Sequence, residues 1–152
     1  MTERKCLNLI KKDWEIISSN PNLLEKGKNW YPNENDYSRE LANKYNLDLQ
    51  QITGLFAAFS PLKSVTENKR ILVNFLNGSR YGHTSLQMNK AELILKTNKL
   101  EKIDLILSGR KTSAFHRHLY NPLCKENVCI DTHLIKYFNK GNIIHITPNR
   151  YS

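Results

Sequence analysis

Apolar residues return every three or four positions along most of this chain, which is the spacing of one face of an α-helix. In the first segment the series begins at Leu7 and ends at Ile17, before Asn20-Pro21. The same pattern predicts helices over eight segments, which are residues 3–19, 37–45, 49–59, 65–76, 89–96, 100–107, 110–120 and 132–139. No segment shows sustained alternation of apolar and polar residues, so the sequence predicts a single all-α domain over residues 1–152.

Capping residues mark where several of these helices begin and end. Asp48 and Ser64 stand where N-cap residues belong, and Glu67 completes a capping-box pattern with Ser64. Gly78 follows the fourth segment in the position of a C′ glycine. The predicted loops between helices include residues 27–32, which contain two aromatic side chains, and residues 79–87.

Charge is distributed unevenly along the chain. The formal net charge is +9, and residues 1–60 contain eight Lys or Arg and eight Asp or Glu, whereas residues 61–152 contain fifteen and six. The whole excess therefore lies beyond residue 60, and an excess of this size favours a polyanionic partner such as nucleic acid. A Lys- and Asn-rich composition inherited from an AT-rich genome is the other explanation.

The cysteines and the start of the chain predict a cytoplasmic protein. There are three cysteines, and Cys124 and Cys129 are separated by four residues, which favours neither a disulfide framework nor a structural metal site. A chain of this length can bury a sufficient core without such bonds. The polar start and the lack of a long apolar run predict neither a secretion signal nor membrane association. The scattered histidines lack metal-ligand spacing, so no metal is expected.

A basic segment and a later aspartate form the strongest candidate for chemistry. Lys111 follows Gly109-Arg110 at a predicted helix start, where the helix dipole and Arg110 both favour the neutral amine that attacks carbon. Asp131 is predicted to cap the helix at residues 132–139, and a carboxylate there could assist such an attack. Both residue types are also ordinary at helix starts, so their spacing alone leaves a purely structural role open.

Two motifs, Gly109-Arg110-Lys111-Thr112 and Ile130-Asp131-Thr132-His133-Leu134, together resemble the signature of the helix-hairpin-helix (HhH-GPD) DNA glycosylases related to endonuclease III. The stretch from Ile52 to Phe75 is similar to that family's early helix, substrate-side loop and following helix. Asn89-Lys90-Ala91-Glu92-Leu93-Ile94 resembles a further family helix, so the resemblance covers roughly residues 50–138. Residues 28–46 also look like small phage-type relatives of this fold.

The resemblance implies a fold and a reaction. Residues 51–140 are expected to form a compact helical glycosylase-like core, which the helices of residues 1–50 complete. Lys111 corresponds to the lysine that attacks the sugar C1′, expels the base and forms a Schiff base, after which β-elimination nicks the strand. Asp131 corresponds to the aspartate that assists this attack and stabilises the positively charged sugar. The implied function is a monomeric DNA glycosylase with abasic-site lyase activity, which acts on double-stranded DNA without a cofactor.

Residues expected to contact DNA surround this pair. The target base must leave the helical stack, and Leu62 stands about where the family places its inserting side chain. A half-buried loop leucine is the other explanation for Leu62. The remaining positions expected to face DNA are Ser60, Lys63, Asn68, Lys90, Gly109, Arg110, Thr112 and His133. Candidates for the base pocket are Trp30, Tyr31, Phe59, Gln87 and again His133.

The chain departs from this family in its hairpin, and the departure leaves two other functions open. The hairpin Leu107-Ser108-Gly109-Arg110 is shorter than the family hairpin, which presents backbone N–H groups to a DNA phosphate. The cluster-binding cysteines of endonuclease III are also absent. The first alternative is a base-modifying transferase on the same fold, which installs groups on modified thymines. The second is a non-catalytic module that binds nucleic acid. The resemblance implies a location in the cytoplasm of a bacterial cell or phage-infected host.

Overall fold

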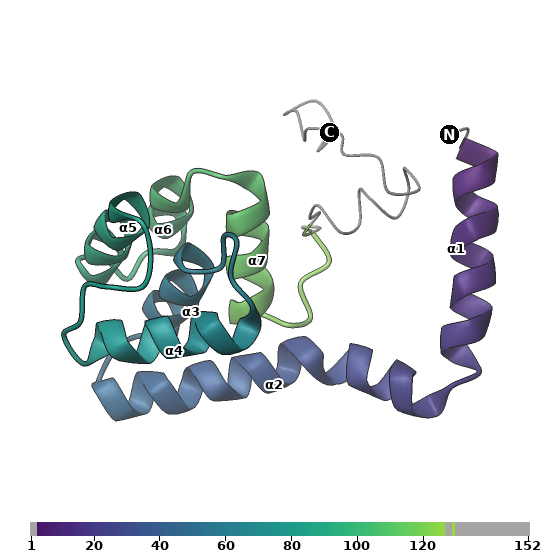
Figure 1. Cartoon of the computed structure of the whole chain (residues 1–152), viewed down its shortest axis with the longest axis horizontal. Coiled ribbons are helices and arrows are strands. Elements are labelled where there is room, and N and C mark those ends of the chain that lie inside the picture. The colour runs from purple at the N-terminus through teal and green to yellow at the C-terminus, as the bar shows by residue number, and fades with distance from the viewer. Residues whose placement is uncertain (1–2, 127–128, 130–152) are drawn as a thin grey trace. The chain divides into compact units, whose positions relative to one another are not determined.

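The computed structural model describes residues 3–126 and residue 129, and within them every regular element is an α-helix (Figure 1). The helices are α1 (Glu3–Ser18), α2 (Pro21–Tyr45), α3 (Leu49–Ala58), α4 (Val65–Leu76), α5 (Ser85–Leu95), α6 (Leu100–Leu107) and α7 (Arg110–Tyr120). The predicted all-α class is therefore confirmed for this part of the chain. The helix predicted at residues 132–139, together with Asp131 and His133, lies outside the described residues.

Contacts divide the chain into two units. One unit spans Tyr31–Cys129, and the described part of the other consists of residues 3–30. In the latter, α1 is the predicted amphipathic helix, and its apolar stripe is exposed to solvent, with Trp14 at 56% of its surface. None of the described helices is both long and apolar enough to cross a membrane. All the contacts discussed below belong to the Tyr31–Cys129 unit.

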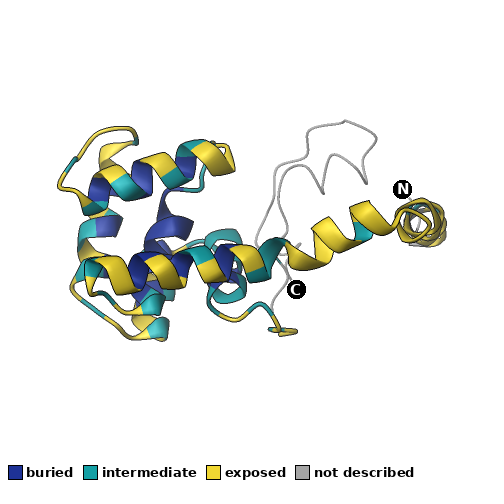
Figure 2. Ribbon diagram, turned by 90° about the horizontal axis from the view of Figure 1, so that it is seen from below, coloured by how far each residue is buried: buried dark blue, intermediate teal, exposed yellow. Residues whose placement is uncertain are grey.

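Helix α3 forms the centre of the Tyr31–Cys129 unit. Helices α4, α5, α6 and α7 all pack against it, and Figure 2 shows the buried residues of this unit in dark blue. A helix that is covered on all sides must lack charge all round, and α3 contains no charged residue. Gly54 allows the closest approach, because a Cβ atom there would lie 2.7 Å from Cγ2 of Ile103 on α6. The core thereby fixes the position of α6, which leads into the hairpin.

The caps predicted at Asp48, Ser64 and Gly78 are confirmed. The side-chain oxygen of Gln51 accepts a hydrogen bond from the backbone N–H of Asp48 at 3.0 Å, ahead of α3. Ser64 Oγ accepts from the backbone N–H of Glu67 at 3.2 Å, at the start of α4. Gly78 has a φ of 96° and follows α4 as its C′ residue. Local side-chain chemistry therefore sets these boundaries, as the sequence indicated.

The loop predicted at residues 27–32 is wrong, because α2 runs continuously from Pro21 to Tyr45 with Pro32 inside it. Pro32 removes one backbone hydrogen bond and Gly27 costs about 1 kcal/mol relative to alanine, so both disfavour a helix without forbidding it. Beyond Pro32 the helix is held by contacts over long sequence separation. Asn35 Nδ2 donates to the carbonyl oxygen of Leu119 at 2.7 Å, and Glu34 pairs with Lys69 at 2.7 Å. Such contacts cannot be deduced from local sequence.

A second boundary also differs from the prediction. Helix α5 begins at Ser85 rather than Asn89, because Thr84 acts as its N-cap and accepts a hydrogen bond from the backbone N–H of Gln87 at 3.4 Å. The loop predicted at residues 79–87 therefore ends at Thr84, and Gln87 is helical. The bounds of α6 and α7 agree with those predicted.

Candidate functional site

Helices α6 and α7 form the short hairpin that the sequence predicted. Helix α6 ends at Leu107, Ser108 adopts the left-handed conformation with a φ of 59°, and Gly109 is the N-cap of α7. Thr112 Oγ1 donates a hydrogen bond to the carbonyl oxygen of Gly109 at 3.0 Å, which closes the turn. Arg110, which is exposed, therefore occupies the first position of α7, and Lys111 the second.

Lys90 binds this hairpin from α5. Its Nζ donates to the carbonyl oxygen of Leu107 at 2.8 Å and to Ser108 Oγ at 2.9 Å. The last carbonyl groups of a helix lack partners within the helix, and a cation is favoured at this negative end of the helix dipole. The sequence places Lys90 among the DNA contacts, but in the structure its ammonium group is committed to the end of α6. Lys90 is thus a support for the hairpin.

Lys111 is placed differently. Its side chain is partly exposed, and no hydrogen bond or ion pair engages its ammonium group within the described part of the chain. Its carbonyl oxygen accepts a long hydrogen bond from Cys129 Sγ at 3.7 Å. The N-cap of α7 is Gly109, which has no side chain to bind the first backbone N–H groups, so among the described residues the first turn keeps the character of an anion-binding helix start. The arrangement combines a primary amine with a position suited to a phosphate.

A charged cluster joins α6 to α7 behind the hairpin. Asp104 accepts hydrogen bonds from His116 Nδ1 at 3.0 Å and from Arg117 Nε at 2.7 Å, and its backbone oxygen accepts from Ser113 Oγ at 3.3 Å. Burial raises the pKa of Asp104, but the hydrogen bonds from His116 and Arg117 outweigh burial, so its pKa lies below the ordinary value. This cluster fixes the angle between the two helices and hence the direction of α7.

The loop between α3 and α4 exposes an apolar side chain completely. Leu62 has a φ of 58° and an exposed fraction of 102%. The half-buried alternative for Leu62 is therefore excluded. Beside it, Lys63 pairs with Glu67 at 3.1 Å, and this hydrogen bond lowers the pKa of Glu67 below its ordinary value. Ser60 Oγ donates to the carbonyl oxygen of Ala57 at 2.8 Å, so the loop is anchored at both ends.

Two predicted site residues lie in the interior instead. Asn68 is 3% exposed and donates to the carbonyl oxygen of Phe56 at 3.0 Å, so it cannot touch DNA in this structure. Phe59 is fully buried and packs edge-on against Phe75, with ring centroids 5.3 Å apart, so it lines no open base pocket. Both occupy helix faces that turn toward the core. The sequence shows which residues share a face but not always which face is covered.

The remaining base-pocket candidates belong to different parts of the chain. Tyr31 is partly buried, with its ring centroid 5.1 Å from that of His118 on α7. Gln87 lies in the first turn of α5. Trp30 belongs to the other unit. The described residues therefore do not show which side chains would receive a base.

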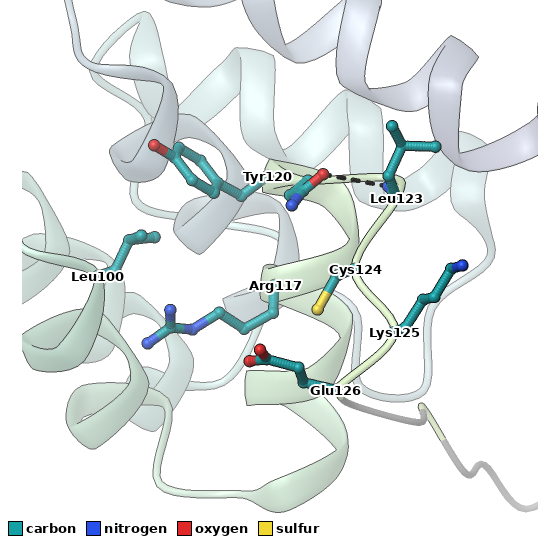
Figure 3. Close-up of a pocket in the computed structure, with 8 residues that line it drawn as sticks. Leu100, Arg117, Tyr120, Leu123, Cys124, Lys125 and Glu126 are labelled. Atoms are coloured by element: carbon teal, nitrogen blue, oxygen red, sulfur yellow. Dashed lines mark hydrogen bonds between the residues drawn. The ribbon is translucent and has the colours of Figure 1, made fainter.

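A pocket of about 380 Å³ lies beside the end of α7 (Figure 3). Its wall combines the side chains of Arg117 and Tyr120 with the turn that follows α7, including Cys124 and Glu126. The residues predicted for the base pocket are not among those that line it. Arg117 is already paired with Asp104, with 2.6 Å between Nη2 and Oδ2. The other charged residues of the lining, Lys125 and Glu126, have opposite signs.

Sequence reasoning missed several residues that shape this region. The sequence does contain a signal for the Asp104 cluster. The three residues that bind Asp104 recur at helical spacing on one face of α7, and they are Ser113, His116 and Arg117. For His83 the sequence contains no such signal. Its contact with the α3–α4 loop joins residues that lie 22 positions apart in sequence.

Comparison with protein families gives one match, which covers residues 1–143. The chain belongs to the DUF7178 family, a family of unknown function. The DUF7178 match includes both Lys111 and Asp131 and extends across both units of the chain. Neither a curated protein nor a solved structure matches the chain.

Proposed function

We propose that this protein is a DNA glycosylase with abasic-site lyase activity, in which Lys111 is the nucleophile. The observation that carries the proposal is the contrast between the two lysines at the α6–α7 hairpin. The Lys90 ammonium group is bound to the end of α6, whereas that of Lys111 has no partner among the described residues. A lysine whose ammonium group makes no described structural contact is available for chemistry. The motif around Lys111 adds the reaction class.

The reaction begins when the amine of Lys111 attacks C1′ of the target nucleotide. The bond from C1′ to the base breaks, the base takes the electron pair and a proton, and the sugar ring opens to give a Schiff base. Loss of a proton from C2′ then expels the 3′ phosphate oxygen and nicks the strand. We assign to Asp131 the stabilisation of positive charge on the sugar, on the basis of its sequence motif.

Several features of the described residues suit a nucleic-acid strand. The start of α7, whose N-cap residue is Gly109, and the exposed Arg110 favour a phosphate next to the amine of Lys111. The fully exposed Leu62 has the character of a side chain that enters the space left by a flipped base. The basic excess beyond residue 60 supplies the long-range attraction to DNA. Double-stranded DNA is accordingly the proposed partner, bound by a monomer.

The test is a panel of duplexes that carry single damaged or hypermodified bases, incubated with the full chain. Products are separated by denaturing electrophoresis and weighed by mass spectrometry. We expect an abasic or nicked strand from at least one duplex, and loss of that product with Lys111→Ala.

Two other results would replace the proposal. An added mass on an intact base would identify a base-modifying transferase. Salt-sensitive binding without any product, unchanged in Lys111→Ala, would identify a non-catalytic binding module.

A further inference from the structure

The α3–α4 loop is held in place by a residue from a different loop. His83 lies between α4 and α5, and its Nε2 lies 3.1 Å from the carbonyl oxygen of Pro61, the residue before Leu62. The backbone N–H of Thr84 donates to His83 Nδ1 at 2.8 Å. Because Nδ1 accepts this bond, the neutral ring carries its proton on Nε2 and donates it to Pro61. The two hydrogen bonds together fix both the tautomer and the direction of the ring.

The loop that carries His83 is itself firmly built. Arg80 donates to the carbonyl oxygens of Phe75 at 3.1 Å and Ser79 at 2.9 Å, and it also pairs with Glu92 on α5. Gly82 has a φ of 103°, and a Cβ atom there would lie 3.1 Å from Cγ1 of Ile71. A glycine is required by this backbone conformation. The His83 backbone is therefore anchored to α4 and α5, independently of the α3–α4 loop.

The core supports the His83 ring from the other side. The ring is stacked on that of Phe59, with centroids 6.3 Å apart and planes inclined by 29°. Phe59, at the end of α3, is fully buried. The imidazole is thus held by ring stacking and by two hydrogen bonds. Its Nε2–H is directed at the one carbonyl that precedes the strained, exposed Leu62.

We propose that His83 is a positioning residue, which holds the α3–α4 loop in the conformation that projects Leu62 toward DNA. A leucine with a φ of 58° is in a conformation that L side chains rarely adopt. Its side chain, being fully exposed, gains no contact that offsets the strain. The hydrogen bond to Pro61 offsets part of this strain from outside the loop. The role in DNA binding rests on the function proposed above, whereas the role in holding the loop does not.

Two substitutions separate the two hydrogen bonds of His83. His83→Gln retains an N–H donor at the position of Nε2, and His83→Asn retains an acceptor at the position of Nδ1. His83→Ala removes both. Gln50→Ala is the matched control, because Gln50 Nε2 also donates to a distant backbone carbonyl, that of Asn98 at 2.8 Å, away from this loop.

The first measurement is amide hydrogen exchange of the free protein. The Lys63 N–H donates to Ser60 across the loop at 3.3 Å and reports on its closure. We expect exchange at Lys63 to become about fivefold faster in His83→Ala and His83→Asn, since one lost hydrogen bond is worth about 1 kcal/mol. His83→Gln and Gln50→Ala should stay close to the parent. Unchanged exchange in His83→Ala, or equal exchange in the Gln and Asn variants, would overturn the positioning role.

The second measurement uses a duplex that carries a non-cleavable abasic analogue next to 2-aminopurine, whose fluorescence rises when the base stack opens. We expect a rise with the parent, with His83→Gln and with Gln50→Ala, and about a fivefold weaker response with His83→Ala and His83→Asn. A full response from the Ala variant would overturn the link between His83 and DNA. No response from the parent would count against the function proposed above, and the exchange result would stand apart from it.

Discussion

The α6–α7 hairpin and the α3–α4 loop each contain a residue with a positive φ at the tip, but the two residues have opposite surroundings. Ser108 has a φ of 59° and Leu62 a φ of 58°. Ser108 Oγ is bound by Lys90 at 2.9 Å, so its strained conformation is offset by a charge-assisted hydrogen bond. Leu62 is wholly exposed and has no such compensation in its own side chain. Backbone strain without a local gain is common at functional sites, and Leu62 therefore remains the proposed inserting residue.

The two segments also expose different kinds of group. The hairpin is fixed on two sides, by Lys90 and by Asp104, and it directs the polar start of α7 outward. The α3–α4 loop is fixed at its ends and through Pro61, and it directs an apolar side chain outward. A nucleophile requires a firmly held polar helix start, as in the hairpin. An inserting side chain requires a firmly held loop that exposes an apolar group, as in the α3–α4 loop. Each of the following predictions alters one side of this comparison.

The largest effect short of removing the nucleophile is expected from shortening the exposed leucine. Leu62→Ala should slow base excision from fully paired duplexes by about 10- to 100-fold, because unstacking a base costs a few kcal/mol and the inserted side chain repays part of it. Excision from a mispaired duplex should slow much less. Single-turnover rates on the two duplexes measure this. Equal slowing on both would show that Leu62 does not act by insertion.

Removal of the Lys90 hydrogen bonds to the hairpin should lower the stability of the protein. Lys90→Met keeps the length of the side chain but loses both hydrogen bonds to the end of α6. The free energy of unfolding should fall by about 1.5–3 kcal/mol, which is the usual range for hydrogen bonds to a charged group. Denaturant titration of Lys90→Met and of the control Lys96→Met, which alters an exposed lysine at the end of the same helix, measures the difference. Equal stability of the two variants would contradict the role given to Lys90.

Glycine substitutions at the two tips compare their strain directly. Leu62→Gly should raise the free energy of unfolding by about 0.5–1 kcal/mol, because glycine adopts a positive φ without cost. Ser108→Gly relieves the same strain but loses the hydrogen bond from Lys90, so its stability should change little. Thermal unfolding of both variants tests this difference. A similar gain in unfolding free energy at both tips would mean that the hydrogen bond from Lys90 does not offset the strain at Ser108.

The smallest effect is confined to acid conditions. The pKa of Asp104 is lowered in the folded protein, so its contribution to stability is present above its unfolded pKa of about 3.9 and is lost as the pH falls through the folded value. The parent should therefore exceed Asp104→Asn in unfolding free energy at pH 6, and the difference should shrink below about pH 4. Denaturant titrations across this range measure it. A difference that grows toward low pH would reverse the assigned sign.

The parts of the fold that were predictable depend on local chemistry. The bounds of α6 and α7 and the caps at Asp48 and Ser64 follow from side chains within a few residues. The course of α2 through Pro32 and the burial of Asn68 depend on partners far along the chain, so the sequence could not supply them.

In the candidate site, too, the features set by nearby residues were predictable and those set by distant partners were not. The position of Lys111 at the start of α7 follows from the motif and the helix pattern. The commitment of Lys90 to Leu107 and Ser108 depends on how α5 packs beside α6. The projection of Leu62 depends on a backbone angle and on a contact between two loops, and neither leaves a trace in residue spacing.

Borohydride trapping on DNA that carries an abasic site tests the central claim most directly. Reduction converts a lysine Schiff base into a stable covalent bond, so the protein and the strand migrate together on a denaturing gel. The account predicts trapping of the parent and of Lys96→Ala, with the modified peptide mapped to Lys111, and no trapping of Lys111→Ala. Trapping of Lys111→Ala to the same extent as the parent would contradict the assignment of Lys111 as the nucleophile.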